Sequence, residues 1–177
     1  GETPLLSLPS VSILKAAPMT RLSLRCREAA QKEAGSAFGA SLPLSPLSNS
    51  TSAKRAALWM GPDEWTLLAP EEDLRAVFDG IEEKLSTHPH ALVDISDRSE
   101  AIIVSGDKAA WLLNTGVFID FSLEVFPVGT VTRTLFHKSP VMIWRTGADT
   151  FVVEAWVSFM DYVAGLLVQS ATELEAA

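Results

Sequence analysis

Two short apolar runs on either side of a Gly-Pro-Asp-Glu stretch constrain the fold of this chain more than any other feature. The runs are "AALWM" at 56–60 and "WTLLA" at 65–69, which are too short for helices and are bounded by turn-forming residues. Pro62 has the φ angle required at the second position of a type I turn, and Asp63 suits the third. We therefore predict an antiparallel hairpin whose turn is shaped by Gly61, Pro62, Asp63 and Trp65.

The adjacent carboxylates of the turn raise the question of acid–base catalysis. Side chains of neighbouring residues such as Asp63 and Glu64 diverge in a turn, and both are expected to face water. General acid–base chemistry requires groups that converge on one substrate, with at least one pKa shifted by burial. We therefore interpret the pair as a structural turn and nominate no catalytic residue.

The first half of the chain has the pattern of a split βαβ unit. Residues 20–26 alternate as a strand does, and 28–38 are rich in helix formers. After the hairpin, 70–85 form the clearest amphipathic helix, and 91–96 resemble a strand. The predicted order is β-α-β-β-α-β.

The second half has a related pattern. A strand at 100–106 precedes a short helix at 108–115 that Asp107 can cap. Strands are predicted at 131–137, 140–145 and 150–155, followed by a final helix capped by Ser158. Two halves that each bury one sheet face under helices predict an α+β fold of two ferredoxin-like, split βαβ halves in one domain.

The remaining segments lack a clear periodicity. We expect residues 1–18 to be an extended N-terminal arm, 19–170 a single domain with halves at about 19–96 and 97–170, 39–55 a mobile loop, and 171–177 a tail. The apolar arm and the Ser/Pro-rich loop are hypothesised contacts with a partner protein, since neither has a period that would pack it within the chain.

Composition excludes several classes of function. The net charge is −8 and Lys and Arg form no cluster, so nucleic-acid binding is not expected. No apolar run approaches membrane-spanning length, and Pro9 interrupts the apolar start, which has no preceding basic region, so neither a membrane span nor a signal peptide is expected. The single cysteine fits a reducing cytoplasm. A mean hydropathy of +0.21 fits either an apolar surface covered by a partner or a core rich in leucine and alanine.

Other candidate sites are weak. His88 and His90 have a spacing that could chelate a metal ion, but no Cys or clustered acid completes a ligand set. Arg25 and Arg27 beside Cys26 could lower its pKa, yet strand alternation places them on the opposite face and favours a buried thiol. The G-x-S-x-G, G-x-G-x-x-G and Walker A patterns are missing. No metal or cofactor ligand is nominated.

Four stretches carry a resemblance to a known family. In order, they are "LWMGPDEWTLL", "ALVDISDRSEAIIVSG", "FPVGTVTRTLF" and "VMIWRTGADTFVVEAWVSFMDYVAGLL". Together they resemble the gamma subunit of heterotetrameric sarcosine oxidase, from about Arg21 to Val168. Met60 stands where the family usually has an aliphatic residue, and Val128 interrupts a Pro-Gly-Thr turn.

The resemblance implies a fold similar to the folate-binding domain of aminomethyltransferases. It also implies an accessory role in a complex that demethylates sarcosine to glycine and passes the methyl carbon to tetrahydrofolate. In that family FAD, FMN and NAD are carried by the alpha and beta subunits and zinc by delta, while gamma carries no cofactor and packs against alpha. The expected function is therefore assembly of the oxidase, without catalysis by this chain alone.

The alternative is a folate-binding or aminomethyltransferase-like protein that acts on its own. Such transferases are about twice as long and carry a catalytic acid near the hairpin that follows the central helix. The corresponding stretch here, 137–145, contains no carboxylate. The K-G-C-Y-x-G-Q-like motif of a related iron–sulfur repair protein is missing as well.

Overall fold

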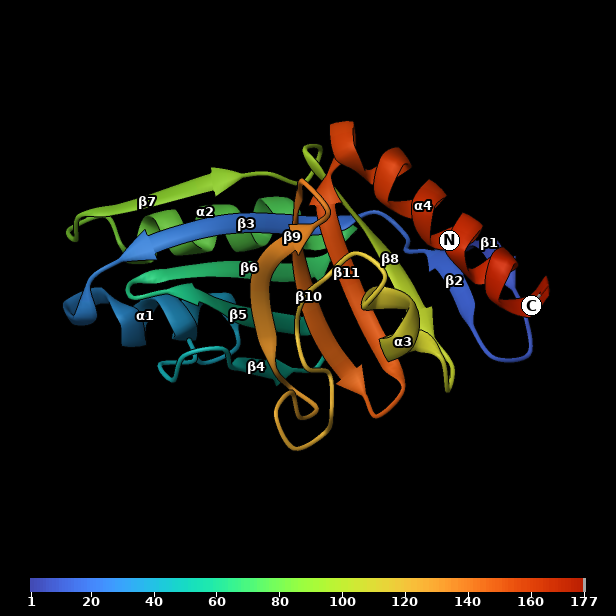
Figure 1. Cartoon of the computed structure of the whole chain (residues 1–177). Helices are drawn as coiled ribbons and strands as arrows, with labels where there is room; N and C mark the ends of the chain where they lie inside the picture. The colour runs from blue at the N-terminus through green and yellow to red at the C-terminus, as the bar shows by residue number, and fades with distance from the viewer. Residues whose placement is uncertain (177) are drawn as a thin grey trace. The chain divides into compact units, whose positions relative to one another are not determined.

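The computed structural model describes residues 1–176, which form two compact units. Unit 2 is the continuous segment Pro18–Asp97, and unit 1 combines Gly1–Ala17 with the chain from Arg98 onward. Each unit has its own antiparallel sheet (Figure 1). Each unit also has its own buried apolar cluster. The predicted α+β class is confirmed.

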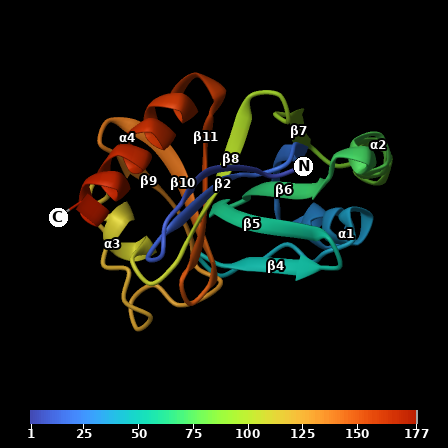
Figure 2. The same cartoon turned by 90° about the vertical axis from the view of Figure 1, so that its right-hand side faces the viewer.

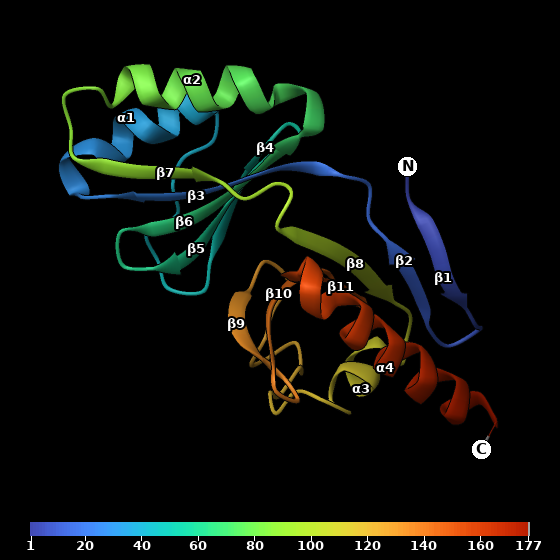
Figure 3. The same ribbon diagram turned by 90° about the horizontal axis from the view of Figure 1, so that it is seen from above.

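Unit 2 contains two helices on one face of a five-stranded sheet (Figure 3). Its elements are β3 (Met19–Cys26), α1 (Glu28–Phe38), β4 (Asn49–Ser52), β5 (Arg55–Gly61), β6 (Glu64–Pro70), the 3-10 turn η1 (Glu71–Asp73), α2 (Leu74–Lys84) and β7 (His90–Asp94). Apolar residues on the inward faces of α1 and α2, such as Phe38 and Ile81, bury themselves against the sheet. The strand order is β4-β5-β6-β3-β7, which is the ferredoxin-like order with β4 added at one edge.

Unit 1 repeats this plan around a six-stranded sheet. Its elements are β1 (Thr3–Ser7), β2 (Ser12–Lys15), β8 (Ser99–Ser105), α3 (Ala109–Leu113), β9 (Val131–Phe136), β10 (Ser139–Gly147), β11 (Thr150–Trp156) and α4 (Val157–Ala176). Helices α3 and α4 cover one sheet face (Figures 1 and 2). The order is β1-β2-β8-β11-β10-β9.

The N-terminal strand β2 completes this second sheet. In a split βαβ unit the strand after the second helix pairs beside the first strand. Here no strand follows α4 among the described residues, and β2 pairs antiparallel with β8 in that place. Unit 1 is therefore a circularly permuted version of the plan of unit 2.

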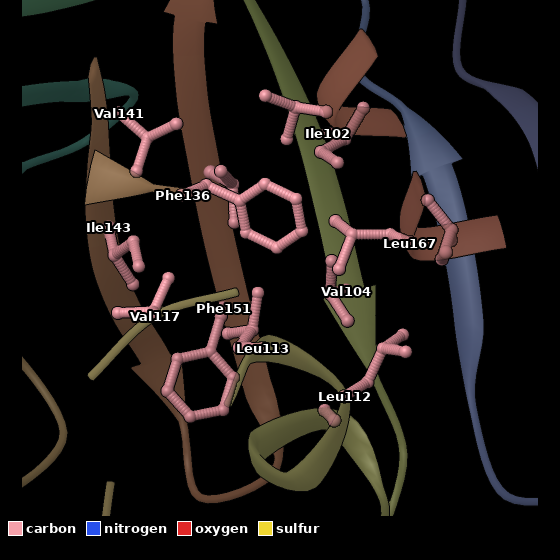
Figure 4. Close-up of a cluster of buried hydrophobic side chains, with 14 of the residues drawn as sticks. Ile102, Val104, Leu112, Leu113, Val117, Phe136, Val141, Ile143, Phe151 and Leu167 are labelled. Atoms are coloured by element: carbon pink, nitrogen blue, oxygen red, sulfur yellow. The ribbon is translucent and has the colours of Figure 1, made fainter. Parts of the chain in front are cut away.

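Side chains from both helices and from strands β2, β8, β9, β10 and β11 fill the core of unit 1, part of which is shown in Figure 4. Phe136, Phe151 and Ile143 point from the sheet toward Leu112 and Leu113 of α3, while Leu167 approaches from α4. Gly116 passes so close to the Phe136 ring that a Cβ atom would lie 2.4 Å from it. The loop after α3 is therefore packed directly on the sheet.

The structure corrects several expectations about segment ends. Residues 1–18 are not a separate arm, because β2 is paired and Val11 and Ile13 are 1% and 0% exposed. The segment 39–55 contains β4, which pairs with β5. The proposed tail begins inside α4, where Ala171 is fully buried. Ser158 lies within α4 rather than capping it. The N-cap position of α3 is occupied by Lys108 and not by Asp107, the residue expected there.

Candidate functional site

The predicted hairpin is present, but its turn differs from the type expected. Gly61 ends β5, Pro62 and Asp63 form the turn, and Trp65 follows on β6 opposite Trp59. Asp63 has φ 62°, whereas the third residue of a type I turn has φ near −90°. A positive φ at this position is the sign that type II requires, and Asp adopts it more readily than most residues.

The two turn carboxylates have separate structural partners. Asp63 Oδ1 accepts a hydrogen bond from Gln31 Nε2 at 2.8 Å, and its carbonyl accepts one from the Cys26 amide at 3.1 Å. Glu64 lies opposite Arg25 in the β3–β6 register, and their side chains form an ion pair at 3.4 Å. The turn therefore docks on the start of α1, and its carboxylates diverge from each other.

Trp65 connects the hairpin to the 39–55 segment. Its side chain is 1% exposed, and Nε1 donates a hydrogen bond to the Pro43 carbonyl at 2.7 Å. Leu42, next to this carbonyl, is buried in the same cluster. The segment predicted to be a mobile loop is thus anchored at Pro43 and at β4, while Leu44 and Leu47 between these anchors are exposed.

Cys26 lines an open hollow of about 410 Å³ at this end of unit 2. The hollow also involves the turn, both neighbouring arginines and His90. The thiol is only 4% exposed, and burial raises its pKa to about 11, with a further rise from the Asp63 carboxylate. The expectation of a buried thiol agrees with this geometry, and a protonated thiol is a poor nucleophile.

We predict that Cys26 resists alkylation in the folded chain. With a pKa of about 11, roughly one thiol in a thousand is ionised at pH ~8. Iodoacetamide should modify it at least about a hundredfold faster in urea than in buffer, because unfolding removes both the burial and the raised pKa. Intact mass reports this site alone, since the chain has a single cysteine. Equal rates in the two conditions would contradict the burial.

The two histidines of "HPH" bind separate glutamates. His88 Nε2 lies 3.3 Å from Glu33 Oε2 of α1, and His90 Nε2 lies 2.8 Å from Glu82 Oε1 of α2. Among residues 1–176, no group of three or more His, Cys, Asp or Glu side chains is placed to hold a metal ion. The pairs instead connect the loop before β7 to α1, through His88, and the start of β7 to α2, through His90.

The side chain of His90 has hydrogen-bond partners at both ring nitrogens. Its Nδ1 donates to the His88 carbonyl at 2.8 Å, and this bond raises its pKa; partial burial opposes the rise, and Glu82 adds to it. Since both ring nitrogens face acceptors, the imidazolium is the form that satisfies them. The pKa of His90 in the folded state therefore lies above its value in the unfolded chain, which is about 6.5.

We predict that the stabilisation from His90 is complete below pH ~6.5 and is lost as the pH rises through its raised pKa. The urea midpoint of the native chain should exceed that of His90→Gln at acidic pH, and the difference should shrink in mildly alkaline buffer. His137→Asn is the control, because His137 is exposed in a turn with φ 52°. A difference that grows with pH would refute this assignment.

A second hollow, of about 720 Å³, follows α1 in unit 2. It is lined by the polar face of the helix, by 39–42 and by β4, including Gln31, Lys32 and Ser50. Gly35 allows close packing here, since a Cβ atom would lie 3.2 Å from the Ala40 carbonyl oxygen. The hollow is open and its lining is more apolar than polar, with Glu28 and Lys32 as the charged residues that line it.

Besides Arg21 and Glu154, Arg145 is a buried charge that sequence reasoning missed. It is 4% exposed on β10 of unit 1. One terminal nitrogen, Nη1, donates to the carbonyls of Phe121 and Phe126, each at 2.7 Å, and Nη2 donates to Ala148 O at 2.6 Å. Its Cζ lies 4.7 Å from the centre of the Phe151 ring.

Arg145 thus holds the loop between α3 and β9, and the sequence did contain a signal for this role. Arg145 is in phase with Val141 and Ile143, which are buried on alternate positions of the same strand. An arginine at a core-facing position needs several acceptors, because its guanidinium stays protonated. Burial lowers the pKa of Arg145, and the Asp149 carboxylate partly offsets this.

Large exposed apolar side chains occur mainly in unit 1. Some belong to the loop that Arg145 holds, and others to the end of β11 and the start of α4. Within unit 1, the members with at least half of their surface exposed are Phe118, Leu123, Val125, Val128, Trp156 and Tyr162, together with Leu135 on β9. Where such groups adjoin one another, monomeric proteins rarely leave them uncovered. No helix among residues 1–176 is both long and apolar enough to span a bilayer.

Comparison with known proteins relates both units to one family. Residues 27–173 match the sarcosine oxidase gamma subunit family. The chain is 30% identical over 122 residues to sarcosine oxidase subunit gamma of Corynebacterium sp. (strain U-96), and 29% identical over 118 residues to that of an Arthrobacter species. These alignments cover 69% and 67% of this chain and only 58% and 57% of the relatives. The match therefore spans less than two thirds of the curated relatives.

Solved structures agree with this assignment. A chain of the heterotetrameric sarcosine oxidase from Corynebacterium sp. U-96 superposes with a TM-score of 0.89 at 26% identity, over 98% of this chain and 90% of that one. Aminomethyltransferase T of the glycine cleavage system from Bartonella henselae shares the fold, with a TM-score of 0.65 at 13% identity, over 87% of this chain and 44% of that one. The resemblance inferred from the sequence is confirmed, and the chain belongs to the sarcosine oxidase gamma subunit family.

Proposed function

We propose that this chain is a non-catalytic accessory subunit of a heterotetrameric sarcosine oxidase, in which it supports assembly or stability. The observation that carries the proposal is its similarity over 98% of its length to a chain of such an oxidase. The exposed apolar side chains of unit 1 support a function based on contact with another protein.

The alpha subunit is the proposed partner, within an alpha-beta-gamma-delta assembly in the cytoplasm. On this proposal FAD, FMN, NAD, zinc and tetrahydrofolate belong to the other subunits, and the assembly oxidises sarcosine to glycine. The geometry around Asp63 supports a structural role for this chain, since both turn carboxylates are engaged by Gln31 and Arg25 rather than converging.

The test is co-expression of the other three subunits with and without this chain. We expect that its omission lowers the yield of assembled oxidase, its flavin content and its sarcosine-dependent peroxide production. An oxidase that assembles and turns over normally without the chain would contradict the proposal.

Calorimetry distinguishes the alternative of an independent folate-binding protein. The isolated chain is titrated with tetrahydrofolate, and we expect no saturable heat. Saturable binding, or turnover of any substrate by the isolated chain, would favour an aminomethyltransferase-like function instead.

A further inference from the structure

The loop at residues 117–130 of unit 1 separates buried from exposed apolar side chains. Val117, Phe121 and Phe126 point into the core, and the rings of the two phenylalanines meet edge to face with centres 5.1 Å apart. The outward apolar members and their exposed fractions are Phe118 103%, Leu123 53%, Val125 59% and Val128 52%. The loop therefore has one face packed on its own unit and one apolar face toward solvent.

This loop is held by specific bonds although it contains no regular secondary structure. Asn114 Nδ2 donates to the carbonyls of Val117 and Ile119, at 3.0 and 2.7 Å. The Phe126 amide donates to Ser122 O at 2.8 Å, and Arg145 holds the two phenylalanine carbonyls from below. Since both ends and the middle are anchored, the outward side chains are presented in a defined arrangement.

A fixed apolar loop in water is unfavourable unless something covers it. Each Å² of apolar surface removed from water contributes about 25 cal/mol, so a surface with several such side chains gains from association. Prior ordering adds to this gain, because a preorganised loop loses little conformational entropy on binding. Arg145 thus orders the 117–130 loop through its buried guanidinium. The outward apolar side chains of this loop are exposed and do not add to the core of unit 1.

The charges around this face indicate the kind of partner. Asp120 and Glu124 are exposed within the loop, and no Lys or Arg occurs in the sequence between Lys108 and Arg133. The amide and hydroxyl of Ser122 hold the pKa of Asp120 below its ordinary value, so this carboxylate stays charged. A second copy of this face, or an anionic lipid surface, would bring like charges together.

We propose that residues 117–130 form the docking surface for a partner subunit whose complementary face is apolar and is rimmed by Lys or Arg. This inference rests on the proposed accessory function and specifies its surface. Phe118 and Val125 are the central anchors, because they are the most exposed apolar side chains of the loop. Asp120 and Glu124 face the basic rim and contribute to the rate and specificity of association.

The experiment compares two double variants in co-expression with the other oxidase subunits. Phe118→Ser/Val125→Ser removes the proposed anchors, and Leu44→Ser/Leu47→Ser removes the exposed apolar side chains of the 39–55 segment, the competing surface. Both pairs are exposed, so the thermal midpoints of the isolated chains should match that of the native chain. We expect only the first pair to weaken co-purification with tagged partner subunits, by about tenfold or more.

A charge variant provides an independent readout. Glu124→Lys should slow association with the partner at low ionic strength, and the difference should narrow once the salt concentration exceeds about 0.15 M. Light scattering of the isolated chain is expected to show a monomer. A dimer that Phe118→Ser/Val125→Ser dissociates would overturn the inference in favour of self-association.

The outcomes separate this inference from the proposed function. If the native chain and Phe118→Ser/Val125→Ser both retain their partners, the docking surface is wrong while the accessory function stands. If Leu44→Ser/Leu47→Ser alone loses them, the interface belongs to the 39–55 segment. If the native chain captures no partner subunit, both proposals are overturned.

Discussion

Removal of residues 1–17 is expected to abolish the cooperative folding of unit 1. Strand β2 pairs with β8, and its Ile13, together with Val11 just before it, is almost fully buried. Burying two such side chains contributes about 3–6 kcal/mol, which is comparable with the whole stability of a typical domain. The truncation would also leave Ile102 and Val104 of β8 without the strand that covers that edge.

Removal of residues 1–7 alone is the matched control. It removes β1, the outermost strand, whose side chains are exposed except at Leu6. We expect a much smaller loss of stability, because β2 and its buried side chains remain. The measurement is urea unfolding followed by circular dichroism, with amide hydrogen exchange read in β8 and β11. Protected amides in these strands after removal of 1–17 would show that β2 is dispensable.

Substitution of Arg145 is the second large effect. Arg145→Met keeps most of the side-chain volume but leaves the carbonyls of Phe121, Phe126 and Ala148 without their donors. Each unsatisfied buried group costs about 1–3 kcal/mol, and the contact with Phe151 is weakened as well. We expect a loss of about 3–5 kcal/mol in the free energy of unfolding.

Arg145→Lys and Lys138→Met complete this comparison. The lysine retains the charge but lacks the planar fork that reaches separate carbonyls, so we expect an intermediate stability. Lys138 is exposed, and its substitution should change the urea midpoint little. If the guanidinium orders the 117–130 loop, the rate of amide hydrogen exchange in Arg145→Met should increase there before it increases elsewhere in unit 1. Unchanged exchange there in Arg145→Met would separate the arginine from the proposed docking surface.

Local periodicity was sufficient to predict most elements. The hairpin at 56–69, the helix 28–38 and the amphipathic helix before β7 appear close to their predicted positions. In these segments the side-chain period and the turn residues agree with each other, so packing has little to override. Loop ends were less accurate, as the missed β4 and the position of Ser158 inside α4 show.

The detailed geometry around Asp63 could be established only from the tertiary structure. The sequence indicated a turn there, but the positive φ depends on the docking of its carbonyl on the Cys26 amide and of its carboxylate on Gln31. Likewise, the burial that raises the pKa of Cys26 comes from packing among β3, α1 and α2. Neither property is encoded in a local pattern.

The sequence by itself determined the class of elements, their order, the family resemblance and the expectation that the turn carboxylates diverge. Only the tertiary structure decided that β2 completes a sheet with strands about a hundred residues away, that Arg145 holds the 117–130 loop, and which apolar residues stay exposed. Alternation and helix periodicity arise from backbone geometry within a few residues. Strand pairing across the chain depends on which distant surfaces bury the most apolar area while satisfying every buried polar group.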